Sequence, residues 1–263
     1  MHTQPATTVT VVPQTIAPSD IADAVANGWR TFRCLPGASM AFASLFAVIG
    51  LMLLTAAGHF NTSPMALPLA GGFMLVGPAV LTGFFRLAAI NDEGRKPGFL
   101  DALAAFTRAP ASLWLVAGVC AFLFLIWMTD AAVLYAFMIG SERLPYDLPW
   151  LISLQRHVIA FEFWAALMGS VLAFIIFAIS AFSVPLLHER RANPVQAISA
   201  SVRAVFSNFL TSIAWGLLLT GSTLLAILLL PLLTVVLPVL AYASFALYRK
   251  VFPLAEDESM SQP

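Results

Sequence analysis

Long apolar runs alternate with short polar segments along this chain. Runs long enough to cross a membrane, which takes about 20 residues, lie at 37–57, 65–89, 111–135, 161–183, 209–229 and 232–248. No polar loop separates the last two, but together they are too long for one crossing, and Pro231 and Pro238 offer places to turn. The pattern therefore predicts an all-α, polytopic transmembrane helical bundle of about six spans, with a tight hairpin at LLLPLL.

Basic residues are distributed unevenly around these spans. Eleven of the thirteen Lys and Arg residues lie before the first span, between spans two and three, between spans four and five, or after the sixth. Only Arg143 and Arg156 fall on the other side. Because cytoplasmic loops carry the excess of positive charge, we expect both termini in the cytoplasm. The membrane domain is expected at 19–252, between a flexible tail at 1–18 and an acidic tail at 253–263.

The polar segments before the odd-numbered spans resemble one another. DAVANGWR begins at Asp23, DALAAFTR at Asp101 and QAISASVR at Gln196. Each has Ala in the second place, an apolar residue in the third and Arg in the eighth, and the first and third have apolar residues at helical spacing. We therefore expect three units, each an amphipathic helix on the inner membrane face followed by a transmembrane hairpin. The alternative is a chance match between short Ala-rich helices.

The amphipathic helices carry the candidates for contacts at the inner face. We expect their apolar stripes, which include Ile21 and Trp29 in the first helix, to face lipid and their arginines to face phosphates. Arg86 ends the second span and is either a snorkelling, topology-setting charge or a contact to anionic lipid or a partner, assisted by Arg95 and Lys96. The inner-face candidates are Arg30, Arg86, Arg108 and Arg203.

Glycines and a proline interrupt the second span, at LPLAGGFMLVGPAVLTGFFR. Gly72, Ala79 and Gly83 fall on one stripe of a helical wheel, and close backbone approach through small residues drives helix association in lipid. We expect a helix–helix contact surface here, with a kink at Pro78. The alternative is a substrate gate. The helix-packing candidates are Gly72, Gly77, Pro78, Ala79 and Gly83.

One carboxylate, Asp130, lies within an apolar run. If that span begins near Pro110, Asp130 lies about 30 Å along it, at the outer interface. A late start or a strong tilt would place it deeper, where it could line a cavity. Arg156 and Glu162 lie in or beside the following outer segment. The three residues form either an outer polar cluster or a solvated boundary.

The sequence contains no motif for catalysis, cofactor binding or metal binding. The four histidines lack ligand spacing, and no GxxxxGK[ST], GxGxxG or GxSxG occurs. Cys34 and Cys120 form no CxxC pair. Zero net charge argues against nucleic acid, while 60% hydrophobic and 10% charged residues fit a membrane protein. We expect no enzyme, cofactor or metal, and partners among membrane lipids, another membrane protein or a second copy.

Five stretches carry a family resemblance: GWRTF at 28–32, AGGFMLVGPAVLTGFF at 70–85, NDEG followed by Pro97, VPLLHERRANPVQAISASVRAVFSN at 184–208 and LPVLAYASFALYRKVF at 237–252. They resemble the bacterial integral membrane proteins catalogued as domain of unknown function 2189, over almost all of 21–252. The resemblance implies a membrane architecture in the bacterial inner membrane and no established activity. The family's last span carries histidines where this chain has Tyr242 and Ala246, so a metal or haem site there lacks its ligands.

Two classes of function follow from these features. The first is a non-catalytic scaffold, assembly or lipid-organising protein, because the spans hold few polar groups and the inner helices are basic. The second is a transporter or channel for an apolar or weakly polar cargo, because the chain has repeats and a Gly/Pro-broken helix. The sequence favours the first.

Overall fold

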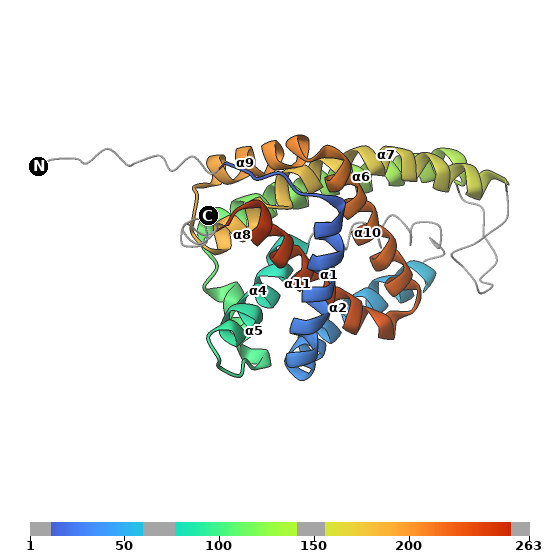
Figure 1. Ribbon diagram of the computed structural model, residues 1–263. Helices are drawn as coiled ribbons and strands as arrows, with labels where there is room; N and C mark the ends of the chain where they lie inside the picture. Colours follow the sequence, from blue (N-terminus) through green and yellow to red (C-terminus); the bar gives the residue numbers. More distant parts are fainter. Residues whose placement is uncertain (1–11, 60–76, 141–155, 254–263) are drawn as a thin grey trace, which may run out of the picture.

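The computed structural model describes residues 12–59, 77–140 and 156–253, and every regular element in these ranges is a helix (Figure 1). In chain order the helices are α1 (Pro18–Cys34), α2 (Pro36–His59), α4 (Gly77–Asp92), α5 (Phe99–Thr107), α6 (Ala111–Met138), α7 (Arg156–Ser180), α8 (Ser183–His188), α9 (Pro194–Ser207), α10 (Phe209–Leu228), the short 3-10 helix η2 (Leu230–Leu232) and α11 (Leu233–Val251).

The protein is a polytopic transmembrane helical bundle, as predicted. Four helical stretches in the described part of the chain are long and apolar enough to cross a membrane: Ala111–Met138, Arg156–His188, Phe209–Ala226 and Leu233–Val251. The bent pair of α1 and α2 makes a fifth if it counts as one span. This agrees with about six spans, because the second predicted span, 65–89, begins outside the described residues.

The long apolar run at 209–248 breaks at Pro231, one of the two predicted positions. Helix α10 ends at Leu228, η2 holds Pro231, and α11 begins at Leu233. Pro238 lies inside α11 and does not end it. The predicted hairpin at LLLPLL is therefore confirmed as two helices joined by a short turn.

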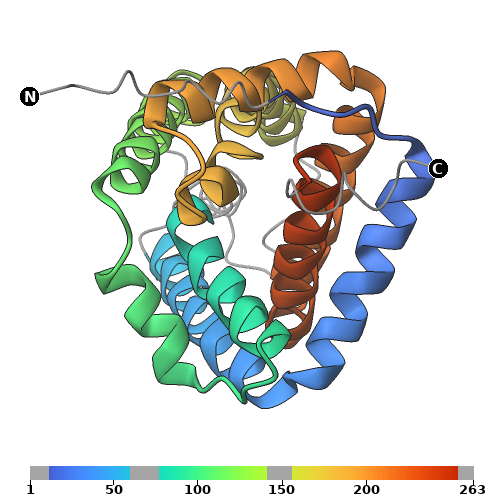
Figure 2. The ribbon, with the colours of Figure 1, turned by 60° about the vertical axis from the view of Figure 1, so that its left-hand side comes forward.

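The three predicted units are present, and they are arranged as a ring. Figure 2 shows the amphipathic helices α1, α5 and α9 on the outside and α11, α4 and α8 within them. Each amphipathic helix packs on the second membrane helix of the unit before it, α5 on α4 and α9 on α7 and α8, while α1 closes the circle by packing along α11. Buried aromatic side chains fill the centre, among them Phe84, Phe85, Phe245 and Tyr248.

The amphipathic helices begin with the same local hydrogen bond. The side chains of Asp20, Asp101 and Gln196 each accept from the backbone N–H three residues earlier, at 2.7, 2.7 and 3.2 Å. The third helix completes a capping box, because Asn193 Oδ1 accepts from the backbone N–H of Gln196 at 2.9 Å. Measured from the shared arginine, α1 begins one turn earlier than the other two.

Helix α1 differs from the expected interfacial helix. Its axis bends by 103° from that of α2, and its apolar stripe faces protein: Ile21 and Ala24 are buried in a cluster with residues of α10 and α11. Gly28 lies so close to α11 that an added Cβ would come within 2.5 Å of the Val239 carbonyl oxygen. Trp29, which was expected to share the lipid-facing stripe, is 47% exposed and so is not covered by protein. The expectation that the stripe faces lipid is thus wrong for Ile21, which packs against protein.

Residues 12–17 bridge the seam of the ring, which is the place where α1 of the first unit meets the third unit. The Gln14 N–H donates to the Val251 carbonyl at 2.9 Å. The Asn208 side chain accepts from the Ile16 N–H at 2.8 Å and donates to the Gln14 carbonyl at 3.2 Å. This part of the expected flexible tail at 1–18 is therefore tied to the ends of α9 and α11.

Candidate functional site

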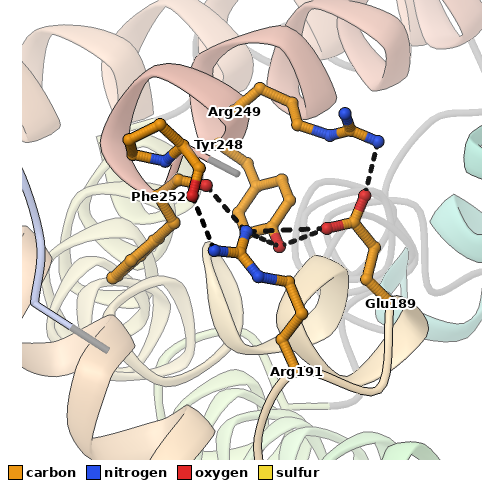
Figure 3. A network of polar contacts seen from close by, with 6 residues as sticks. Glu189, Arg191, Tyr248, Arg249 and Phe252 are labelled. Atoms are coloured by element: carbon orange, nitrogen blue, oxygen red, sulfur yellow. Dashed lines mark hydrogen bonds and ion pairs between the residues drawn. The ribbon is translucent and has the colours of Figure 1, made fainter. Parts of the chain in front are cut away.

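The main polar cluster in the described part of the chain lies where the ends of α8 and α11 meet. We call it the clasp network; it consists of Glu189, Arg191, Tyr248 and Arg249 together with the carbonyl groups of Phe252 and Pro253 (Figure 3). Glu189 and Arg191 follow α8, the end of the second unit, and the other residues end the third unit. The network therefore joins two consecutive units through residues that are 57 and 59 positions apart in sequence.

Glu189 is the acceptor at the centre of the clasp network. Its Oε2 accepts from the Tyr248 hydroxyl at 2.6 Å, and its Oε1 accepts from Arg249 Nη2 at 2.6 Å. The Glu189 side chain is 15% exposed, so water does not meet its hydrogen-bonding needs, and these two donors do. A single carboxylate thus binds two successive residues on the last turn of α11.

Arg191 also binds the end of α11, through a separate set of hydrogen bonds. Its guanidinium donates to the carbonyls of Phe252 at 2.7 Å and Pro253 at 2.8 Å, and to the Tyr248 hydroxyl at 3.0 Å. Carbonyls at the end of a helix lack intrahelical donors and carry the negative end of the helix dipole. Arg191 therefore acts as a C-terminal cap for α11 that is supplied by another unit.

Arg249 links the clasp network to the aromatic centre. Its guanidinium lies 4.9 Å from the centroid of the Phe245 ring, and that ring stacks on Phe85 of α4 at 4.9 Å. Phe85 in turn meets the His188 ring edge-on. Side chains from α4, α8 and α11 thus converge at one end of the bundle. Their charged groups and aromatic rings pair with one another, and this pairing stabilises the junction.

A repeated turn sets the position of the network. The chain reads Glu-Gly-Arg at 93–95 after α4 and Glu-Arg-Arg at 189–191 after α8. The central residues have φ of +72° and +56°, and the arginine N–H that follows bonds to the carbonyl five residues back, at 3.1 and 3.0 Å. Both helices therefore end in a Schellman turn. In both turns the Glu side chain pairs with the Arg two residues on.

A second polar contact ties α1 to α11. The Lys250 ammonium group donates to Asp20 at 2.7 Å and to Asp23 at 2.8 Å. The hydrogen bond from Lys250, with a smaller contribution from the Ala17 backbone N–H, holds the pKa of Asp20 below its ordinary value. The outcome is a charged contact at the same end of α11 as the clasp network.

Of the predicted helix-packing residues, the structure positions Gly83 most clearly. An added Cβ there would lie 2.4 Å from the Phe42 ring of α2 and 3.3 Å from the Ala102 carbonyl of α5, so Gly83 sits at a three-helix contact. Gly72 lies outside the described residues. Gly77, Pro78 and Ala79 form the first turn of α4 as described, and the chain before them is outside the described ranges, so the kink at Pro78 stays a prediction.

The inner-face arginines occupy two kinds of position. Arg30, Arg108 and Arg203 are all exposed on the outer helices α1 and α9 and directly after α5. Arg86 is only partly exposed, on α4, one of the inner helices. Its partial burial separates it from the other three.

The outer-side candidates lie on the α6–α7 pair, which Figure 1 shows side by side. Asp130 is partly exposed on α6, and Arg156 is exposed at the start of α7. Glu162 is partly exposed on α7, but its Oε2 is buried with no hydrogen-bond partner among the described residues. Neither an ion pair nor a hydrogen bond between these three is among the contacts of the described residues.

The clasp network was missed in the sequence. Its partners are separated by 57 to 62 residues, and neither hydrophobic period nor motif spacing links them. The repeated Glu-x-Arg at 93–95 and 189–191 was the available signal, because it recurs directly after two equivalent helices.

Comparison with known proteins finds a family match over part of the chain. No curated protein and no solved structure matches it. The resemblance seen in the sequence extends over 21–252, and outside 65–189 it stays a prediction. Residues 65–189, from the second predicted span to the Glu189 turn, match the family described as predicted integral membrane protein (DUF2189), which confirms the resemblance and makes the protein a multi-pass integral membrane protein.

Proposed function

We propose that the protein is a non-catalytic membrane scaffold whose outer ring of amphipathic helices binds anionic lipid at the inner face of a bacterial inner membrane, with both termini in the cytoplasm. One observation carries the proposal. At equivalent places in the three units, an alanine is at most 1% exposed against the bundle, while the arginine six residues later is exposed: Ala24, Ala102 and Ala197, followed by Arg30, Arg108 and Arg203.

The arrangement supports lipid binding on electrostatic grounds. Basic side chains near an anionic leaflet contribute about 1 kcal/mol each, and three on the circumference of one ring act on the same lipid annulus. The clasp network supports a structural role, because Glu189, Arg191 and Tyr248 are engaged with one another and with the end of α11. A protein partner or a second copy that carries acidic groups would meet the same arginines.

The test is the lipid composition that travels with the protein. The triple variant Arg30→Gln, Arg108→Gln, Arg203→Gln and the wild type are extracted with a styrene–maleic acid copolymer, and the ratio of phosphatidylglycerol to phosphatidylethanolamine is measured. We expect wild type to be enriched in phosphatidylglycerol over the bulk membrane and the triple variant to approach the bulk ratio. Arg156→Gln, an exposed arginine at the start of α7, is the control and should keep the enrichment. An unchanged ratio in the triple variant would overturn the proposal.

Glu162 supports a second candidate, a transporter for an apolar or weakly polar cargo. A carboxylate oxygen that is buried without a hydrogen-bond partner inside a candidate span is the kind of group that lines ion and substrate pathways. Proteoliposomes with wild type, Glu162→Gln and Asp130→Asn would be loaded with a small library of weakly polar dyes. A flux that exceeds empty liposomes and falls in Glu162→Gln supports transport, and a flux equal to empty liposomes contradicts it.

A further inference from the structure

A cavity of about 430 Å³ lies between the elbow that joins α1 to α2 and the turn that joins α4 to α5. Residues 34–38 form one wall, and Asn91 with residues 94–97 forms the other. The first unit thus supplies both walls, from the start of its first membrane helix and the end of its second. The volume is within the range of small-molecule sites.

Two cationic side chains, Arg95 and Lys96, line this cavity. The described lining holds no carboxylate, and Asn91 adds an amide. Gly37 and Ala38, in the first turn of α2, also line the cavity, and first-turn N–H groups have no acceptor within their helix. These N–H groups add to the two side chains, which supply the formal charge. The donors together suit a phosphate group.

The position of the cavity favours a lipid as the source of that phosphate. Helix α2, the first predicted span, begins at Pro36, and α4 ends at Asp92, so both membrane helices reach their polar ends here. The headgroup layer of the bilayer lies at this level. The neighbouring Pro36 is exposed and offers apolar surface to the glycerol and upper acyl carbons.

We infer that this cavity is a binding site for the phosphate of an anionic lipid headgroup, held by Arg95 and Lys96. The inference deepens the proposed function and rests on it for the lipid, while the site is separate from Arg30, Arg108 and Arg203. Glu93 regulates the site, because its carboxylate pairs with Arg95 and competes with the phosphate for that guanidinium. The pairing also holds the pKa of Glu93 below its ordinary value, so Glu93 competes in its charged form at neutral pH.

The chain contains a reporter of occupancy. Cys34 lines the cavity and its thiol is exposed, whereas Cys120 is buried. The rate of Cys34 alkylation by a maleimide is measured on the detergent-purified protein with increasing phosphatidylglycerol, and separately with phosphatidylcholine and with soluble glycerol 3-phosphate. We expect phosphatidylglycerol to slow alkylation several-fold and the other two to have little effect at equal concentration.

Variants of opposite sign distinguish binding from misfolding. Arg95→Gln with Lys96→Gln should raise the phosphatidylglycerol concentration for half-protection about thirtyfold, since two charge contacts of about 1 kcal/mol each are lost. Glu93→Gln should lower it, because Arg95 is released from its internal partner. Arg190→Gln, an exposed arginine outside the lining, is the matched control and should leave the concentration unchanged.

The outcomes separate this inference from the proposed function. Absence of protection in wild type, or an equal response of the Arg95/Lys96 double variant and wild type, overturns the cavity site. Equal protection by glycerol 3-phosphate overturns the assignment to lipid. If the Arg30/Arg108/Arg203 variant loses lipid enrichment but keeps Cys34 protection, both proposals stand as separate sites. If it keeps the enrichment while Cys34 is protected in wild type, the outer ring proposal fails and the cavity site stands.

Discussion

At the residue scale, Arg191 and Glu189 show how one short turn holds two consecutive units together. Each side chain reaches across from the turn after α8 to the last turn of α11. The two have opposite charge and bind opposite kinds of group: Glu189 accepts from donors, and Arg191 donates to helix-end carbonyls. The Tyr248 hydroxyl serves both, since it donates to Glu189 and accepts from Arg191. The junction therefore tolerates the loss of either charge poorly.

Replacement of Arg191 by Gln should destabilise the protein more than the same replacement of an exposed arginine does. Hydrogen bonds to a charged group contribute about 1.5–3 kcal/mol, and glutamine is too short to reach all three acceptors, so we expect a loss of about 2 kcal/mol or more in the free energy of unfolding. The measurement is denaturant unfolding in detergent. Arg190→Gln, one residue earlier and exposed, should change stability little, and an equal effect of both variants would contradict the role of Arg191.

Protonation of Asp20 should weaken the contact between α1 and α11. The pKa of Asp20 is lower in the folded protein than the ordinary value of 3.8, chiefly through the Lys250 hydrogen bond. The contribution of the Asp20 carboxylate to the free energy of unfolding is thus complete above about pH 4, and it is lost as pH falls through the folded-state pKa. Thermal unfolding at pH 5 and pH 3 should show a smaller acid-induced loss in Asp20→Asn than in wild type.

Asp92 gives the contrasting case. Desolvation raises its pKa, although Arg249 opposes the change, so a fall in pH favours the folded state at this residue. Asp92→Asn should therefore leave the protein at least as sensitive to acid as wild type. A smaller acid-induced loss in Asp92→Asn than in Asp20→Asn would reverse the signs and contradict both assignments.

At the scale of elements, local signals in the sequence decided most of what was predicted well. Apolar run length located the membrane helices, and Pro231 located the turn at η2. These features act within a few residues, so sequence alone carries them. Amphipathicity reports that α1 has an apolar stripe but not what covers it, and here α11 covers it.

The close packing of α1 on α11 depends on one missing side chain. At Gly28 an added Cβ would lie 2.5 Å from the Val239 oxygen and 2.8 Å from the Ala243 nitrogen, and both are backbone atoms that cannot rotate away. Gly28→Ala should therefore push the two helices apart and lower the melting temperature. Gly118→Ala on α6 is the control, because an added Cβ there meets nothing within 4 Å.

The control variant is not expected to lower the melting temperature. Alanine is favoured over glycine in a helix interior by about 1 kcal/mol, so Gly118→Ala should be neutral or stabilising. Equal melting temperatures of the two variants would show that α1 shifts away from α11 at little cost. The close packing of the two helices would then contribute little to the stability of the protein.

At the scale of the whole molecule, the order of packing explains why α1 lies on α11. In the second and third units the amphipathic helix packs on the last membrane helix of the preceding unit. For the first unit, the third unit supplies that surface through α11. The seam is then sealed by residues 12–17 and by Lys250. The closed ring of units brings Gln14 and Val251 together.

This closure predicts that the chain can be cut and rejoined. The Gln14 N–H and the Val251 carbonyl are 2.9 Å apart, so joining residue 263 to residue 1 needs no added linker. New ends between Arg95 and Lys96, in the turn between the first two units, would keep every membrane helix paired with its neighbour in sequence. We expect this permutant to insert, purify as a single species and melt within a few degrees of wild type, as surface openings between packed units allow.

The matched control opens the ring inside a unit. New ends at the turn between α10 and α11 separate the two helices of one transmembrane hairpin and place the break on the other side of the membrane from the joined termini. That permutant should fail to insert α11 correctly, as reported by protease accessibility of the new ends. If both permutants behave alike, adjacency of the chain ends is incidental, and the seam at α1 and α11 contributes no more than any other helix contact.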